Sequence, residues 1–279
     1  MRAAPNPLPT KLIKPGLPWR PALLAQASAV CHLGAGVTVA AAPAAWPWAL
    51  GAVALNHAVI TANGLWPRSR WLGPNLTRLP AACARKEIAL TIDDGPDPAV
   101  TPLVLDLLDR YAAKASFFCI GANAERYPAL CREIVRRGHA VENHSQHHHH
   151  HFALLGFKAI EGEITAAQNA LTAISGQRPV FFRPPAGLRN PFLEPVLAKL
   201  GLTLATWSVR GFDTRTQDAA VVVKRLKRGL QAGAILLVHD GNAARTADDQ
   251  PVILSVLPAI LELARARGLK TVTLREAVP

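Results

Sequence analysis

The N-terminal part of the chain contains two long apolar stretches. No Lys, Arg, Asp or Glu occurs between Arg20 and Arg68. The run from Leu23 to Ala42, formed as a helix, extends about 30 Å, which is the thickness of a bilayer core. Proline residues at 43–47 interrupt this run because proline lacks the backbone donor that a helix needs, and a second apolar run covers 49–65. The pattern predicts a membrane anchor of two helices within residues 21–66.

Tryptophan residues mark the ends of both apolar runs. Five of the six lie there, where amphipathic rings prefer the lipid headgroup region: Trp19, Trp46, Trp48, Trp66 and Trp71. A cleaved signal peptide, with the alanines at 40–42 as its cleavage site, would explain the first run, but it leaves the second run unexplained. Two further interpretations of the pattern are a buried helical hairpin of a soluble protein and a hairpin that enters the membrane without crossing it.

From Glu87 onward, short β-rich segments alternate with helical segments. The expected strands are 87–93, 114–120, 139–143, 180–183, 203–209, 234–239 and 270–272, and the expected helices are 100–112, 122–137, 159–175, 192–200, 218–230 and 252–267. Because each strand but the last is followed by a helix, we expect an α/β fold with a parallel, barrel-like sheet. The predicted organisation is a basic tail at 1–20, the anchor at 21–66, a basic linker at 67–86 and an α/β domain at 87–279.

Charge is distributed unevenly between these parts. The net charge is +12; residues 1–86 carry nine basic residues and no acidic one, whereas residues 87–279 carry 22 basic and 19 acidic residues. The near balance in the α/β domain argues against a nucleic-acid partner. Because both outer flanks of the apolar runs are basic and the loop between them is uncharged, the positive-inside rule predicts a two-pass protein of a bacterial-type inner membrane with a cytoplasmic α/β domain. The four cysteines have no CxxC spacing, which argues against a thiolate zinc site or a disulfide scaffold.

Polar residues recur at the carboxyl ends of the expected strands, where barrel enzymes carry their chemistry. Asp93 and Asp94 end the first strand, and neighbouring strand side chains point to opposite faces, so one is available to bind a metal and the other to take a proton. Arg183, Asp213 and His239 lie at other strand ends. Arg183 needs an acidic partner, because an unpaired buried charge is costly. Taken singly, each of these residues also fits a structural role in a turn, an ion pair or the core.

A histidine-rich segment follows the third expected strand. His144 and His148 are four residues apart, so one helical turn brings both rings to the same side. With one carboxylate they make a set typical of catalytic zinc, which keeps a position open for water. Residues 147–151 are all histidine, so His147 and His151 are alternatives to His148 as the second ligand. Such a run is also typical of a solvated stretch that binds metals adventitiously.

Four motifs in order resemble the polysaccharide deacetylase family (carbohydrate esterase family 4), whose members share the NodB homology domain. They are Thr91-Ile92-Asp93-Asp94-Gly95-Pro96, His144-Ser145 with His148, Arg183-Pro184-Pro185-Ala186-Gly187 and Leu237-Val238-His239. The resemblance covers residues 87–279 and implies a distorted (β/α)7 barrel. It implies a divalent metal, expected to be Zn²⁺, held by Asp94, His144 and His148. It also implies that Asp93 is the general base, oriented by Arg183, and that His239 is the general acid, tuned by Asp213.

Two of the matching regions depart from the family pattern. Arg210 and Thr214 replace an Asp and a Trp that are common around the position of Asp213, and Ala186 stands where a Tyr is common. The departures leave the catalytic set intact and alter the substrate groove. The substrate contacts expected from the resemblance are Pro185, Ala186, Trp207 and Leu237.

The resemblance implies a metal-dependent hydrolase that removes an N-acyl group, expected to be N-acetyl, from an amino sugar in a polysaccharide or a lipid-linked glycan precursor. The predicted orientation and the departures at Arg210 and Thr214 favour a lipid-linked sugar on the cytoplasmic face, with membrane lipids as further partners. A second hypothesis is a membrane-tethered carbohydrate-binding protein without catalysis. A third is a periplasm-facing deacetylase of peptidoglycan or exported polysaccharide.

Overall fold

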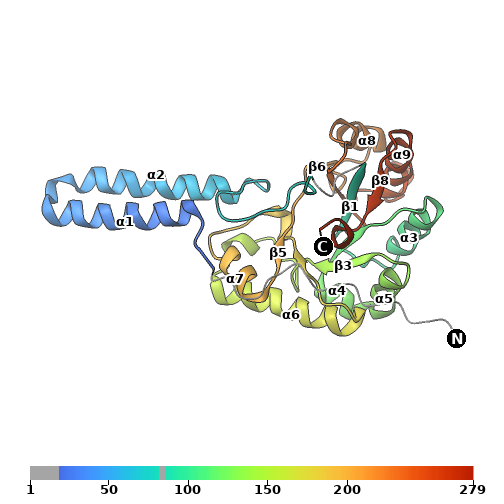
Figure 1. Ribbon diagram of the computed structural model, residues 1–279, viewed down its shortest axis with the longest axis horizontal. Coiled ribbons are helices and arrows are strands. Elements are labelled where there is room, and N and C mark those ends of the chain that lie inside the picture. The colour runs from blue at the N-terminus through green and yellow to red at the C-terminus, as the bar shows by residue number, and fades with distance from the viewer. Residues whose placement is uncertain (1–18, 82–85, 279) are drawn as a thin grey trace.

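The computed structural model describes residues 19–81 and 86–278. The predicted basic tail at 1–20 therefore lies almost entirely outside the described residues, as does Arg85 in the predicted linker. The described chain forms an α/β domain from which a pair of long helices projects (Figure 1).

A parallel sheet of eight strands forms the centre of the α/β domain. The expected α/β barrel is confirmed, with its strands short and its closure irregular. Across the sheet the order is β5 (Thr203–Leu204), β4 (Phe181–Phe182), β3 (Ala140–Asn143), β2 (Ser116–Cys119), β1 (Glu87–Asp93), β7 (Ile235–His239) and β6 (Val209–Arg210), and β8 (Lys270–Val272) pairs with the first residues of β1. The apolar residues of β1 and β7 are buried on both faces, as is usual for central parallel strands.

The expected strand at 203–209 is divided between the two edges of this sheet. Its first residues form β5 beside β4, and its last residues enter β6 beside β7. The predicted linker fits between these two ends: the amide of Leu76 donates to the carbonyl of Leu204 at 2.9 Å, and the amide of Leu79 donates to the carbonyl of Gly233 at 2.9 Å. The described part of the linker thus packs into the barrel, where it fills the break in strand pairing.

Helices cover the outside of the sheet (Figure 1). The expected helix at 122–137 is two helices, because Pro128 disfavours helical backbone at Tyr127 before it. The largest core cluster packs the sheet against α3, α5, α8 and α9. The helices of the domain are α3 (Thr101–Arg110), α4 (Gly121–Arg126), α5 (Pro128–Arg136), α6 (Phe157–Ser175), α7 (Leu193–Leu200), α8 (Ala219–Arg228), α9 (Ile253–Ala266) and α10 (Leu274–Ala277), with short η2 (Phe152–Leu154) and η3 (Pro185–Gly187).

The two apolar runs form a helical hairpin of α1 (Leu23–Ala41) and α2 (Trp46–Gly64), joined by η1 (Pro43–Ala45). The helices lie side by side and extend away from the sheet (Figure 1). Polar contacts join them: Asn56 Nδ2 donates to Ser28 Oγ at 2.9 Å, and ring nitrogens of His32 and His57 lie 3.2 Å apart.

Apolar side chains on the hairpin are largely exposed. Among the described residues, α1 is the one helix long and apolar enough to cross a membrane, and only 6 % of that stretch is buried. The second predicted span is less apolar because α2 carries Asn56, His57 and Asn63. Exposed large apolar residues of the hairpin include Leu23, Val30, Leu33, Val37, Leu50 and Leu55.

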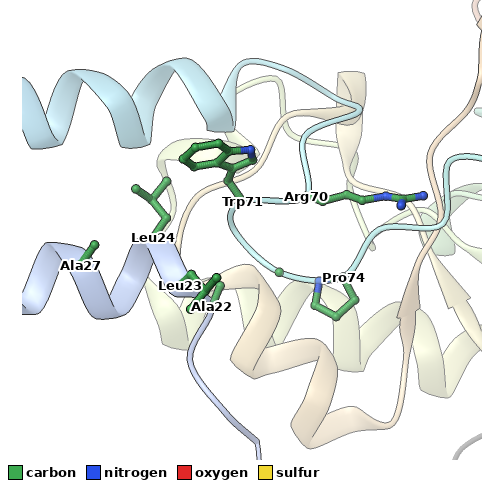
Figure 2. A pocket seen from close by; sticks show the side chains of 8 residues that line it. Ala22, Leu23, Leu24, Ala27, Arg70, Trp71 and Pro74 are labelled. Carbon is green, nitrogen blue, oxygen red and sulfur yellow. The ribbon is translucent and has the colours of Figure 1, made fainter.

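A mainly apolar cavity of 610 Å³ lies where the hairpin joins the α/β domain (Figure 2). Figure 2 shows the side chains of Leu24 and Trp71 close together, between the start of α1 and the segment after α2. The guanidinium of Arg70 extends away from α1, and its Nη2 donates to Thr77 Oγ1 at 3.2 Å. This junction therefore offers an apolar surface rather than a charged one.

Candidate metal centre and active site

The predicted functional residues gather at the carboxyl ends of the parallel strands. Asp93 and His239 are paired across β1 and β7. His144 directly follows β3, and Arg183 directly follows β4. Because all these strands run in the same direction, their ends meet at one edge of the sheet, as the sequence predicts.

Asp94, His144 and His148 form a cluster with the geometry of a metal site. Asp94 Oδ1 lies 3.2 Å from Nε2 of His144 and 3.2 Å from Nε2 of His148. This oxygen is buried and accepts no hydrogen bond from the described residues. Two imidazole nitrogens and one carboxylate oxygen are the donor set of many catalytic zinc sites, and a divalent cation would satisfy the unpartnered oxygen. The three residues therefore fit a divalent metal.

The second histidine reaches this cluster through a loop, so the expected helical turn is wrong. Ser145 and His148 both have positive φ values, 64° and 51°, in a segment without helical structure. The loop is held by the amide of His148, which donates to Ser145 Oγ at 3.1 Å. His147, the alternative ligand, faces away: its Nδ1 lies 2.7 Å from Glu163 Oε1. The backbone turn thus brings His148, rather than His147, toward Asp94.

Neighbouring groups prepare the cluster for a cation. The Nδ1 of His144 hydrogen-bonds the carbonyl oxygen of Arg183 at 2.7 Å, which leaves Nε2 free to face Asp94. Burial, with the nearby charge of His144, lowers the pKa of His148 to about 4, so its ring is neutral and has a lone pair at pH 7. Burial raises the pKa of Asp94, but the adjacent ring of His144, with the charges of His239 and His148, outweighs it and holds that pKa well below the usual range.

Arg183 has the acidic partner that the sequence requires. Its Nη1 donates to Asp93 Oδ1 at 2.5 Å and to Thr91 Oγ1 at 3.0 Å. Its Nε and Nη2 donate to the carbonyl oxygens of Ala205 and Thr206 at 2.9 and 2.8 Å. The side chain is fully buried, and burial lowers the pKa of Arg183 although Asp93 opposes this shift. The arrangement holds the Asp93 carboxylate in one orientation.

His239 and Asp213 form a second buried pair. Asp213 Oδ1 lies 3.0 Å from Nδ1 of His239, and Asp213 Oδ2 accepts the His239 backbone amide at 2.7 Å. Burial lowers the pKa of His239, but the charge and hydrogen bond of Asp213, with the charges of Asp94 and Asp93, raise it above the ordinary 6.5. The ring therefore keeps its proton to higher pH than an ordinary histidine does.

Comparison with known proteins agrees with this geometry. The family model described as polysaccharide deacetylase matches residues 82–205. A peptidoglycan-N-acetylglucosamine deacetylase of Bacillus cereus is 32% identical over 193 residues, which are 68% of this chain and 87% of that protein. The chain belongs to the polysaccharide deacetylase family. Members of this family are hydrolases that act on carbon–nitrogen bonds other than peptide bonds.

Further relatives of this polysaccharide deacetylase chain differ in length and share its fold. A peptidoglycan-N-acetylglucosamine deacetylase of Listeria monocytogenes is 33% identical over 198 residues, which are 71% of this chain, and the chain spans only 40% of its length. A family 4 carbohydrate esterase from Streptomyces lividans, solved in complex with acetate, is 32% identical with a TM-score of 0.60. That match covers 67% of this chain and 92% of the Streptomyces chain.

The residues expected to contact substrate differ in their exposure. Ala186, in η3, has a positive φ of 55° and is exposed. Pro185 and Trp207 are buried, and the Trp207 ring packs close to Gly187. Leu237 is fully buried in the core cluster that contains Trp207, so its side chain serves packing in this structure. Contact of these residues with substrate stays a prediction.

Two polar residues beside the deacetylase site were not expected from the sequence. Asn242 Nδ2 donates to Asp94 Oδ2 at 3.2 Å, which orients the carboxylate whose other oxygen faces the histidines. Asp240 is buried behind the loop at Gly95, and burial raises its pKa to about 7. Asp240 directly follows His239, so its position just after the end of a strand could have marked it as a candidate site residue. Asn242 carried no such signal, because its role depends on the folding of its loop.

Proposed function

We propose that the chain is a metal-dependent hydrolase that removes an N-acetyl group from an amino sugar in a glycan. The observation that carries this proposal is the arrangement of three elements at one sheet edge: the Asp94, His144 and His148 cluster, the Asp93–Arg183 pair and the His239–Asp213 pair. Amide hydrolysis needs a base, an acid and a group that stabilises negative charge on oxygen, and these elements supply all three.

Each residue has a distinct task in this proposal. Asp94, His144 and His148 would hold a divalent cation, expected to be Zn²⁺, which would supply Lewis-acid polarisation of the acyl carbonyl and of a water molecule. Asp93 accepts a proton from the attacking water as the water oxygen bonds to the acyl carbon. His239 gives its proton to the sugar nitrogen as the carbon–nitrogen bond breaks, which releases acetate and the free amine. Arg183 positions Asp93, and Asp213 positions His239.

The proposed substrate is a membrane-associated, lipid-linked amino sugar rather than a bulk polymer. The relatives from Bacillus cereus and Listeria monocytogenes are peptidoglycan deacetylases, which supports an N-acetyl amino sugar as the class of substrate. Arg210 and Thr214 replace residues common in the family beside Asp213, which supports a substrate with different contacts. The helical hairpin that extends from the domain supports a substrate at a membrane surface (Figure 1).

We propose further that α1 and α2 enter an inner membrane together, with the α/β domain on the cytoplasmic side. The exposed apolar side chains of α1 support the membrane location, and its contacts with α2 support entry as a pair. Trp46 and Trp48 lie at the far end of the hairpin, and Trp66 lies at the near end, as expected of residues at two lipid interfaces. Reporter fusions at the C-terminus test the orientation; activity of a periplasmic reporter would support a periplasm-facing deacetylase instead.

The activity is tested by measuring acetate release from N-acetyl chitooligosaccharides, with metal content measured on the same samples. Asp93→Asn should keep the metal and lose turnover by about 10²- to 10⁴-fold. Asp249→Asn is the matched control, because Asp249 is exposed and pairs only with Arg245 on the surface. Undiminished turnover by Asp93→Asn contradicts the base assignment. Sugar binding by the intact chain without acetate release from any N-acetyl sugar supports a carbohydrate-binding protein without catalysis.

A further inference from the structure

A cavity of 540 Å³ lies between the chain that follows α2, the end of β6 and the last turn of α8. Four arginines line it, together with two tryptophans: Arg68, Arg210, Arg225, Arg228, Trp66 and Trp207. We call it the arginine cavity. None of the described residues that line it is acidic.

The arginines of this cavity lack counter-charges within the described chain. None of the four forms an ion pair there, in contrast to Arg137, Arg183 and Arg275. Arg225 Nη1 donates to the carbonyl of Gly211 at 3.1 Å, and Nε of Arg210 is buried without a hydrogen-bond partner. Guanidinium groups gathered without carboxylates repel one another, and a bound anion with several oxygens would relieve that repulsion through charge-assisted hydrogen bonds.

Aromatic rings hold two of the arginines in place. The Phe212 ring centroid lies 5.1 Å from the guanidinium carbon of Arg210 and 5.6 Å from that of Arg225. Arg210 also lies 5.3 Å from the Trp207 ring centroid. Cation–π contacts of this kind restrict the side chains before any ligand arrives, which lowers the entropy cost of binding. The cavity is therefore preorganised for an anion.

The position of the arginine cavity connects the hairpin with the catalytic residues. Trp66 and Arg68 follow the end of α2 within four residues, so a membrane that contains α2 places the cavity at the level of the lipid headgroups. On its other side, the Trp207 ring centroid lies 5.8 Å from the guanidinium of Arg183, which holds Asp93. The Trp207 side chain thus lies between the arginine cavity and the Arg183–Asp93 pair.

We propose that the arginine cavity binds the phosphate that joins the amino sugar to its membrane lipid. This inference rests on the proposed function and adds the chemical group by which the substrate is recognised. A neutral polymer has no group that would use four guanidiniums that have no carboxylate partner among the described residues. A phosphate ester at a membrane surface has the required charge, and the cavity that would hold it shares Trp207 with the packing around Arg183.

Binding is tested by calorimetry on the full chain in detergent micelles, with glucosamine 1-phosphate, glucosamine and inorganic phosphate as probes. None of these carries an acyl group, so none is consumed during the titration. Glucosamine 1-phosphate should bind at least about tenfold more tightly than glucosamine, because one charge-assisted hydrogen bond to its phosphate is strong enough for such a difference. It should also bind more tightly than inorganic phosphate, because its sugar adds contacts with the tryptophans that line the cavity. The double variant Arg210→Gln/Arg228→Gln should remove the preference. Arg265→Gln, at an exposed position on α9, is the matched control and should keep it.

Kinetics supply the second arm, with N-acetylglucosamine joined by phosphate to a short polyprenyl chain in vesicles. The double variant should raise the KM for this substrate by at least about tenfold more than the KM for an N-acetyl chitooligosaccharide. Equal affinity for inorganic phosphate and glucosamine 1-phosphate would assign the cavity to a free anion and overturn the proposal. An unchanged preference in the double variant would overturn it too. Phosphate-dependent binding by a chain that hydrolyses no N-acetyl sugar would refute the proposed function and leave the phosphate site standing.

Discussion

The buried pair of Arg183 and Asp93 makes a sharp prediction about stability. Arg183→Met removes the partner of a buried carboxylate and leaves the carbonyls of Ala205 and Thr206 without their donors. Breaking a buried ion pair in this way costs about 3–5 kcal/mol. Because small domains are stable by about 5–15 kcal/mol, the variant should still fold but unfold at much lower denaturant. Arg183→Lys keeps the charge but not the planar set of donors, so it should lose less stability than Arg183→Met does.

The measurement is urea unfolding of the full chain at pH 7, followed by circular dichroism. The double variant Arg183→Met/Asp93→Asn should recover part of the loss, since the unpaired charge is then gone. Arg136→Met is the control: Arg136 pairs with Glu133 on the surface, and its removal should leave the midpoint nearly unchanged. Strictly additive effects in the double variant, or an Arg183→Met variant as stable as the unaltered chain, would refute the view that Asp93 and Arg183 stabilise each other as a buried pair.

Three further predictions concern the site. His148→Ala should abolish stoichiometric metal binding measured by elemental analysis, whereas His147→Ala should keep it; the reverse result would identify His147 as the ligand. Asp213→Asn should lower the pKa of His239, so the alkaline limb of the kcat profile should move to lower pH, and an unmoved limb contradicts the pairing. The raised pKa of His239 also makes stability depend on pH. The pairing with Asp213 contributes its full stabilisation below pH 6.5, and this contribution is lost as the pH rises through the pKa of His239 in the folded state. Gly187→Ala should destabilise the chain by about 1–3 kcal/mol, because φ is 74° and the new Cβ meets the Trp207 ring, and an unchanged urea midpoint would show that this packing is not tight.

The sequence alone determined the elements whose patterns are local. The apolar runs of β1 and β7 and the periodicity of α6 and α9 predict these elements within one or two residues of their bounds. Helical and strand periodicities are read from neighbours along the chain, so no distant contact is needed to recognise them. The sequence also placed Asp93, Arg183 and His239 at one edge of the sheet, because each lies at the carboxyl end of an expected parallel strand, where active-site residues of such folds lie.

The tertiary structure decided every feature that depends on a distant partner. The segment at 203–209 is one β-rich run in sequence, but its halves pair with different strands because β4 and β7 stand on opposite sides of the opening in the barrel. A run of identical histidines holds no information on which ring faces Asp94; two positive φ values in the loop select His148. Arg68 and Arg228 are 160 positions apart in sequence, and only folding brings their positive charges to one cavity. Composition records how many charges a chain carries, whereas their mutual distances, which set their energies, exist only in three dimensions.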